Sequence, residues 1–343
     1  MRAPAAHRRR YPERMRLATW NVNSARTRID RIIAFLDRQD IDVLAMQEIK
    51  CRPEQFPREA FATAGYELAV HGLDQWNGVA IASRVGLTDI AVSFPGQPAW
   101  VRTEDAPAVV EARALGATVG ARAADRTDSP GATVPEADGP TSGSVRLWSL
   151  YVPNGRELDH PHYRYKLAWL AALRESAGQW LAEDAGQSLA LAGDWNVAPQ
   201  DEDVWDMSVF DGATHVSEPE RAAFRAFEEE GLSEVTRGRV TNYTYWDYQK
   251  LRFPRNEGMR IDFVYGSAAL ASRVTGAAID RDERIRPRAR HHRSRLTSPK
   301  QSASGIRGRG SGRSVRASEP HALGRRVAHP GRPPDAAPPG RPR

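Results

Sequence analysis

Carboxylate and amide side chains occur at the ends of several short apolar runs, and their types suit the binding of a hard metal ion. Asn21 and Glu48 close the first two runs, Asp194 and Asn196 follow a later one, and Asp262 lies within the last clear run. An extended backbone directs Asp194 and Asn196 to the same face because they are two positions apart. The pattern predicts that a carboxylate and an amide converge on one ligand.

Magnesium binds a few carboxylate and carbonyl oxygens and completes its shell with water or substrate phosphate oxygens. The five side chains named above supply that set. A zinc site is disfavoured because the chain has a single cysteine, Cys51, and no two histidines four positions apart. Singly, each residue has a simpler explanation, since an acid at a strand end more often serves as a cap or turn residue. Their joint occurrence favours a metal-dependent active site.

The segments that must position these residues are short strands and amphipathic helices. Runs rich in Val, Ile and aromatic residues alternate with helical patterns, which predicts a layered α/β protein with a mixed sheet. Strands are expected at 16–21, 41–47, 66–71, 78–83, 108–115, 145–152, 188–193 and 260–265, and helices at 27–38, 57–64, 162–183 and 219–230.

The overall composition is that of a globular protein. With 343 residues, 40% hydrophobic and 27% charged, the chain is long enough for one large or two ordinary domains. No apolar run has the length needed to cross a bilayer, and the basic start lacks the apolar centre of a secretory signal. One cysteine suits a reducing compartment, so we expect a cytoplasmic protein in which Cys51 is structural.

Positive charge is concentrated at the two ends of the chain. Residues 286–343 hold 14 Arg and 1 Lys against 2 acidic residues, which gives +13, and residues 1–14 carry +4. Because the whole chain carries +6, residues 15–285 carry −11. Any contact between the globular part and a nucleic acid is therefore expected to come from a local basic surface.

Three stretches depart from globular composition. Residues 1–14 are a basic extension that we expect to be disordered, with Met15 as an alternative start. Residues 116–144 contain no aromatic residue and are expected to form a long surface insertion between two strands. Residues 285–343 also lack aromatic residues and are rich in Arg and Pro, so we expect a disordered tail. This leaves residues 15–284 as the folded domain.

Seven motifs are spread along the folded part of the sequence. They are Ala18-Thr-Trp-Asn-Val-Asn-Ser-Ala-Arg, Leu44-Ala-Met-Gln-Glu-Ile-Lys-Cys, Asn77-Gly-Val-Ala-Ile, Tyr151-Val-Pro-Asn-Gly, Leu191-Ala-Gly-Asp-Trp-Asn-Val-Ala-Pro, Thr244-Tyr-Trp-Asp-Tyr and Met259-Arg-Ile-Asp-Phe. With these motifs, the sequence resembles the exonuclease III and apurinic/apyrimidinic endonuclease group of the endonuclease/exonuclease/phosphatase superfamily over roughly residues 15–284.

The resemblance implies a fold, an activity and a partner. The implied fold is a four-layer α/β sandwich with two mixed sheets flanked by helices. The implied activity is Mg²⁺-dependent hydrolysis of DNA phosphodiesters, with Mn²⁺ as an alternative ion, at 3′ ends and at abasic sites. The expected partner is double-stranded DNA with such sites. We also expect a monomer that associates with the nucleoid and has no membrane partner.

The resemblance also implies roles for the residues at the strand ends. Glu48 is the expected principal metal ligand, with Asn21, Asp194 and Asn196 as supporting ligands. Asp194 is in addition the expected base for the attacking water. Asn196 is expected to donate to the phosphoryl oxygen as charge develops.

Further roles are implied for two residues outside this set, and several more are candidate DNA contacts. Tyr151 is expected to donate to the phosphate or assist the leaving group; without its Val-Pro-Asn-Gly context it would be read as a half-buried strand tyrosine. Asp262 is expected to hold the network. Trp246 is expected to stack beside an abasic nucleotide, with a plain aromatic surface cluster as the equal alternative. Candidate phosphate contacts are Asn154, Arg156, Arg164 and Lys166; the alternative is that these side chains are simply solvated. We assign no catalytic role to His160 and His162.

The sequence departs from the family pattern at its end. The family ends with Ser-Asp-His-Ala-Pro and a hydrophobic strand, but this chain continues from Ile285 with Arg-Pro-Arg-Ala-Arg-His-His. A back-translation of residues 285–297, read one base later, can encode Ser-Asp-His-Ala-Pro-Val-Ile-Ile-Asp-Leu-Asp followed by a stop. We infer a frameshift, and we expect the final strand and the phosphate-contacting histidine to be missing.

Two other functions stay open at this point. One is a phosphodiesterase of the same fold that acts on lipid headgroups, against which the Tyr151 and Thr244 motifs argue. The other is a catalytically weak DNA-binding protein, because the histidine is absent and the tail is cationic. Comparing binding with turnover on one abasic duplex separates the second from a nuclease.

We predict that this protein is a poor nuclease and that a version with the family ending after Arg284 is faster and melts at a higher temperature. Loss of an oxyanion-type donor slows turnover by roughly 10²- to 10³-fold. Abasic-site cleavage and melting temperature are measured at one salt concentration, with a short-linker version as a further control. Equal rates and stabilities for all versions would show that the altered ending has no functional consequence.

Overall fold

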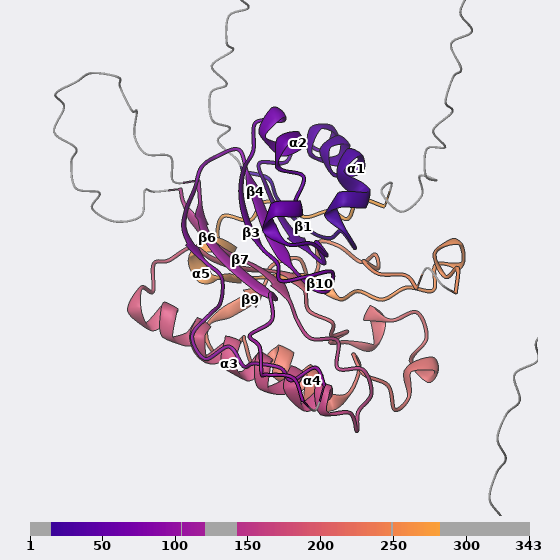
Figure 1. Ribbon diagram of the computed structural model, residues 1–343. Coiled ribbons are helices and arrows are strands. Elements are labelled where there is room, and N and C mark those ends of the chain that lie inside the picture. Colours follow the sequence, from indigo (N-terminus) through magenta and orange to yellow (C-terminus); the bar gives the residue numbers. More distant parts are fainter. Residues whose placement is uncertain (1–14, 104, 121–142, 248–249, 282–343) are drawn as a thin grey trace, which may run out of the picture. The chain divides into compact units, whose positions relative to one another are not determined.

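Two β-sheets face each other and bury one apolar core between them. The computed structural model describes residues 15–103, 105–120, 143–247 and 250–281, which belong to one compact unit (Figure 1). The predicted basic extension and the predicted Arg/Pro-rich tail lie outside these residues. The predicted loss of a final strand concerns the tail and also lies outside them. So do residues 121–142 of the predicted insertion.

The first sheet has four strands in the order β1-β2-β4-β3, and the second has six in the order β5-β6-β7-β8-β10-β9. Each sheet contains one parallel pair, β1 with β2 and β7 with β8, and is otherwise antiparallel. The strands are β1 (Leu17–Asn21), β2 (Val43–Gln47), β3 (Glu67–His71), β4 (Val79–Ser83), β5 (Leu87–Ala91), β6 (Ala114–Val119), β7 (Val145–Tyr151), β8 (Leu189–Asp194), β9 (Leu232–Glu234) and β10 (Asp262–Ser267).

Helices cover the outer face of each sheet, which completes four layers (Figure 1). The helices α1 (Ala25–Arg38) and α2 (Arg58–Thr63) lie on the first sheet, and α3 (Pro161–Glu183) and α4 (Glu218–Arg225) lie on the second. The short helix α5 (Ala268–Ala271) follows β10. In the described part of the chain, no helix combines the length and apolar character needed to span a bilayer.

Alternation of side chains along the strands explains the layers. In β2, Val43 and Ala45 enter the core between the sheets, whereas Leu44 and Met46 enter the core beneath α1 and α2. Since successive strand residues face opposite sides, a strand buried on both faces is apolar throughout. This is why the central strands read as continuous apolar runs. Cys51 is buried in the core beneath α1 and α2, as expected.

The structure confirms the four-layer sandwich and corrects several predicted elements. The strand predicted at 108–115 lies at Ala114–Val119, so residues 116–119 of the predicted insertion belong to β6. The strands β5 and β9 were not predicted, and the helix predicted at 219–230 ends at Arg225.

Gly193 of β8 pairs with Leu150 of β7, directly before Asp194. A Cβ atom at this position would lie 1.9 Å from the carbonyl oxygen of Leu150. We predict that Gly193→Ala lowers the free energy of unfolding by roughly 1–3 kcal/mol or more, the usual cost of overpacking. Urea denaturation measures this, with Gly276→Ala as control because a Cβ there meets no atom within 4 Å. Equal losses in the two variants would contradict the close approach.

Candidate active site

The predicted site residues meet where the parallel strands of the two sheets end. Asn21 is the last residue of β1, Tyr151 the last of β7 and Asp194 the last of β8, and Glu48 follows β2 directly. Because β1 runs parallel to β2 and β7 parallel to β8, the carboxyl ends of each pair lie at the same edge. The fold therefore brings together residues from both sheets.

Asn21 joins the two acids across the interface between the sheets. Its Nδ2 donates to Glu48 Oε1 at 2.7 Å and to Asp194 Oδ2 at 2.8 Å. Its Oδ1 accepts from the backbone N–H of Asn23 at 3.1 Å. Asn21 thus presents its amide nitrogen, and not the expected metal-binding oxygen, to the two carboxylates.

Glu48 is surrounded by donors. Besides Asn21, the Tyr151 hydroxyl donates to Oε1 at 3.0 Å, and Lys50 Nζ lies 2.7 Å from Oε2. Burial on its own would raise the pKa of Glu48, but the hydrogen bonds from Asn21 and Lys50, the Lys50 charge and the Tyr151 hydroxyl together lower it. The lowered pKa keeps this carboxylate ionised, which is the form in which a carboxylate binds a cation. Lys50 was missed at the sequence level, although it lies only two positions after Glu48.

The ring of Tyr151 packs against a buried ion pair of Arg113 and Glu111. The Arg113 guanidinium lies 4.9 Å from the centre of the Tyr151 ring, and its Nε is 2.6 Å from Glu111 Oε2. Burial and the nearby Glu48 charge raise the pKa of Tyr151 well above its usual value. The phenol therefore keeps its proton and acts as a donor.

Asp194 faces a second acid across β8 and β10. Its partner in the register is Asp262, and Asp194 is only 4% exposed. Burial and the Asp262 charge raise the pKa of Asp194 well above its usual value, in spite of the hydrogen bond from Asn21. A carboxylate with a raised pKa is a stronger base, so Asp194 and Glu48 are suited to different tasks.

Asn196 lies on a second side of the site, with Asn154 and His215. Its Nδ2 donates to the Val152 carbonyl at 2.9 Å, and its Oδ1 lies 3.4 Å from Asn154 Nδ2 and 3.1 Å from His215 Nε2. These hydrogen bonds of the Asn196 side chain go to neither Glu48 nor Asn21. Burial and the Lys166 charge lower the pKa of His215 to about 4, which makes its imidazole neutral at pH 7. His215 was not predicted, because no local motif marks it.

The structure separates the four candidate phosphate contacts. Asn154, Arg156 and Arg164 are exposed, and Arg156 Nη1 lies 3.2 Å from His160 Nε2. Lys166 is fully buried and paired with Glu220, so it cannot contact a phosphate from this position. The prediction that Lys166 contacts a phosphate is wrong, because this residue of α3 faces the core and not the solvent.

Trp246 is covered in the structure. It is 2% exposed, and its ring packs edge-on against Phe253 at 4.9 Å between centroids. The Arg281 guanidinium lies 5.5 Å from the same ring. The structure thus does not bring Trp246 to the surface, and stacking on DNA would require this segment to rearrange. The neighbouring Tyr245 is 36% exposed.

The donor set fits a hard divalent cation. Glu48, Asp194 and Asp262 offer only oxygen ligands, and the three acids lie at the ends of adjoining strands. Among the described residues, no group of three or more acidic, histidine or cysteine side chains is placed to hold a metal ion. Magnesium often binds through one or two carboxylates and completes its shell with water and phosphate oxygens. Glu48 suits that mode of binding.

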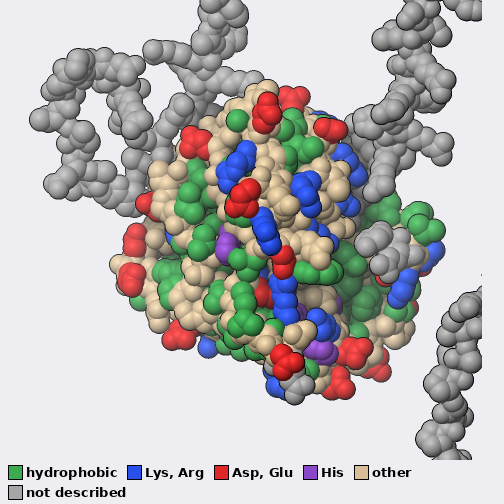
Figure 2. All heavy atoms as spheres, viewed as in Figure 1, with side chains coloured by type: hydrophobic (Ala, Val, Ile, Leu, Met, Phe, Trp, Pro, Cys, Tyr) green, Lys and Arg blue, Asp and Glu red, His purple; other side chains and the backbone are tan. Residues whose placement is uncertain are grey.

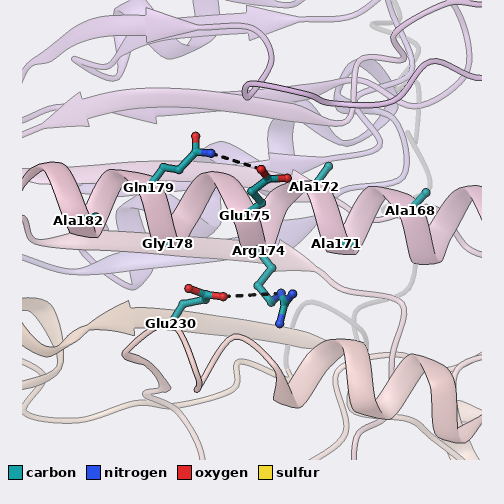
Figure 3. A pocket seen from close by; sticks show the side chains of 9 residues that line it. All are labelled: Ala168, Ala171, Ala172, Arg174, Glu175, Gly178, Gln179, Ala182 and Glu230. Carbon is teal, nitrogen blue, oxygen red and sulfur yellow. Dashed lines mark hydrogen bonds and ion pairs between the residues drawn. The ribbon is translucent and has the colours of Figure 1, made fainter.

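One face of the surface (Figure 2) and a hollow along α3 show no alternative site. Figure 2 shows basic and acidic side chains interleaved across one face, without a uniformly basic area. A hollow of about 680 Å³ lies along α3, lined by alanines, Arg174 and Glu175 of that helix and by Glu230 from a separate segment (Figure 3). Its lining includes none of the predicted site residues, so the chemistry is assigned to the strand ends.

Comparison with known proteins decides the family. The endonuclease/exonuclease/phosphatase family matches residues 18–311. The chain belongs to this family. Within it, the chain is an enzyme of the exonuclease III and AP endonuclease group, whose members hydrolyse phosphodiester bonds, depend in general on divalent metal ions and act on DNA.

Individual relatives support this placement. Exodeoxyribonuclease III of Haemophilus influenzae is 25% identical over 292 residues, which cover 81% of this chain and 97% of the relative. A 3′-5′ exonuclease of Neisseria meningitidis has a TM-score of 0.66 at 30% identity, covering 80% and 95% of the two chains. A Neisseria 3′ phosphatase bound to a product DNA hairpin has a TM-score of 0.62 at 31% identity, and the match covers 76% of this chain and 89% of that one. An AP endonuclease of Archaeoglobus fulgidus has a TM-score of 0.65 at 28% identity, and the match covers 80% of this chain and 95% of that one.

The raised pKa of Asp194 generates a pH prediction. A base must be deprotonated, so its activity is lost as the pH falls through the raised pKa. We predict that Asp262→Asn moves the acid limb of the kcat profile to lower pH, because the repelling charge is removed. Single-turnover rates from pH 5 to 9 measure this, with the exposed Asp211→Asn as control. An acid limb that does not move would contradict the coupling of Asp194 to Asp262.

Proposed function

We propose that this enzyme is a Mg²⁺-dependent DNA repair nuclease that acts at 3′ ends and abasic sites, with Mn²⁺ as an alternative ion. The observation that carries the proposal is the contact of Asn21 with both Glu48 and Asp194. This contact places an ionised carboxylate, Glu48, beside a buried base of raised pKa, Asp194. The names of the relatives, which cover exonuclease, 3′ phosphatase and AP endonuclease, support DNA as the substrate.

Glu48 would hold the metal ion, which supplies charge neutralisation at the scissile phosphate. Asp194 accepts the proton of the attacking water, and the Asp262 charge keeps its pKa high enough for that task. Tyr151 donates a hydrogen bond to a phosphate oxygen or to the leaving group, since its raised pKa keeps the phenol neutral. Asn196 and Asn154 lie on the adjoining side of the site, where amide donors stabilise developing charge.

A substrate panel tests the choice of DNA over a lipid headgroup. It contains a duplex with a recessed 3′ end, a duplex with one abasic site, a 3′-phosphate duplex, sphingomyelin vesicles and phosphoinositide vesicles. We expect turnover of the duplexes alone. Turnover of the vesicles without turnover of DNA would overturn the proposed substrate, while binding of DNA without turnover would favour the weak DNA-binding protein.

The metal assignment predicts the behaviour of Glu48→Gln. Activity is expected to disappear in excess chelator and to return with Mg²⁺ or Mn²⁺. The variant should raise the Mg²⁺ concentration for half-maximal rate by at least about 10- to 100-fold, since even outer-shell partners of metals have effects of that size. Glu54→Gln, at an exposed acid, is the matched control. Full activity in excess chelator would contradict the requirement for a metal ion.

The base assignment predicts the behaviour of Asp194→Asn. We expect kcat to fall by roughly 10²- to 10⁴-fold, the usual contribution of general-base catalysis. KM is expected to change little because phosphate contacts dominate DNA binding. Steady-state and single-turnover rates on the recessed duplex provide the measurement. A normal kcat would exclude Asp194 as the base.

A further inference from the structure

A buried ion pair joins α3 to the start of α4 beneath the active site. The side chains of Lys166 and Glu220 are each 0% exposed, and Lys166 Nζ contacts Glu220 Oε1. Removing two charges from water is costly, and apolar residues of similar size are often as good or better for stability. The stability of the fold alone therefore does not account for a lysine at this position.

Lys166 has three acceptors, one for each of its ammonium hydrogens. Besides Glu220, Nζ lies 2.6 Å from the carbonyl oxygen of Asn196 and 3.4 Å from that of Asn154. These two carbonyls belong to the loops that follow β8 and β7, the strands that end in Asp194 and Tyr151. One ammonium group therefore ties together the backbones of two active-site loops.

Glu220 fixes a third loop in the same way. Its Oε1 accepts from the backbone N–H of His215 at 3.0 Å. Its Oε2 accepts from the backbone N–H of Ser217 at 3.3 Å and from the Ser217 hydroxyl at 2.5 Å. Both carboxylate oxygens are thus satisfied, as a buried acid requires.

The three loops present side chains that touch one another. Asn154 Nδ2 lies 3.1 Å from His215 Nε2 and 3.4 Å from Asn196 Oδ1, and His215 Nε2 lies 3.1 Å from the same oxygen. These three side chains, which we call the amide–histidine triangle, come from positions up to 61 residues apart. The ion pair contacts the backbone of every member.

We propose that Lys166 and Glu220 are positioning residues that hold the amide–histidine triangle in register at the scissile phosphate. The inference rests on the proposed nuclease function for its kinetic consequences. Hydrogen bonds to three carbonyl and carboxylate acceptors have fixed directions, whereas apolar packing does not. A displacement of about 1 Å in a positioned group can slow a reaction by roughly 100-fold.

Two double variants test this proposal. Lys166→Met with Glu220→Met removes both charges and every directed contact, and Lys166→Gln with Glu220→Gln removes the charges but keeps donors and acceptors. We expect the methionine pair to lose kcat by roughly 10- to 100-fold, with KM changed less than about threefold. The glutamine pair should recover most of the loss. Melting temperatures show that both variants are folded.

A matched control removes another ion pair with a buried acid, far from the strand ends that carry the site. Arg84 Nη2 lies 2.9 Å from Asp42 Oδ1, and Asp42 directly precedes β2. Arg84→Met with Asp42→Asn is expected to lower the melting temperature and to leave kcat unchanged. Should the methionine pair not fold, Glu220→Asp replaces it, because it keeps both charges but shortens the anchor, and roughly a tenfold loss of kcat is expected.

A second measurement does not depend on turnover. Side-chain amide NMR signals of ¹⁵N-asparagine-labelled protein, assigned with Asn154→Asp and Asn196→Asp, report the order of the triangle. We expect both signals to move towards solvent values in the methionine pair and to stay in place in the control. Unchanged signals and kcat in a folded methionine pair would overturn the positioning role. A wild-type enzyme inactive on DNA would overturn the proposed function alone, because the NMR result would still decide the positioning role.

Discussion

The active site depends on one contact: the side-chain amide of Asn21 is hydrogen-bonded to two acids that come from different sheets. The other features of the fold hold these two acids in place. Asn21 Nδ2 contacts Glu48 of the first sheet and Asp194 of the second. Like charges at such proximity repel strongly when water is excluded. The parallel pairs β1–β2 and β7–β8, the close approach at Gly193 and the donors around Glu48 hold the acids together in spite of that repulsion.

The surroundings of the two acids give them opposite properties. Glu48 receives donors from Asn21, Lys50 and Tyr151, which lower its pKa. Asp194 is buried and faces Asp262, which raises its pKa. A pair of carboxylates whose pKa values are driven apart can divide the work between charge stabilisation and proton transfer. The division follows from position in the sheets, since both residues have the same functional group.

Much of the fold and part of the site could be predicted from the sequence, because both depend on local patterns. Alternating apolar runs predicted most central strands, and polar residues at their ends predicted Glu48 and Asp194. Contacts between distant segments could not be predicted. Lys166 looked like a surface cation because its partner, Glu220, lies 54 residues away. The burial of Trp246 depends on Phe253 and Arg281, and the place of His215 depends on two loops that no motif connects to it.

The central claim is that Glu48 and Asp194 act as one catalytic unit built across the two sheets. A double-mutant cycle of Glu48→Gln and Asp194→Asn on a recessed 3′-end duplex, at saturating Mg²⁺, tests it most directly. Residues that act as one unit have strongly non-additive effects on turnover. We expect the double variant to lose about as much kcat as the more damaged single variant. Losses that simply multiply would show that the two carboxylates act independently and would contradict their role as one unit.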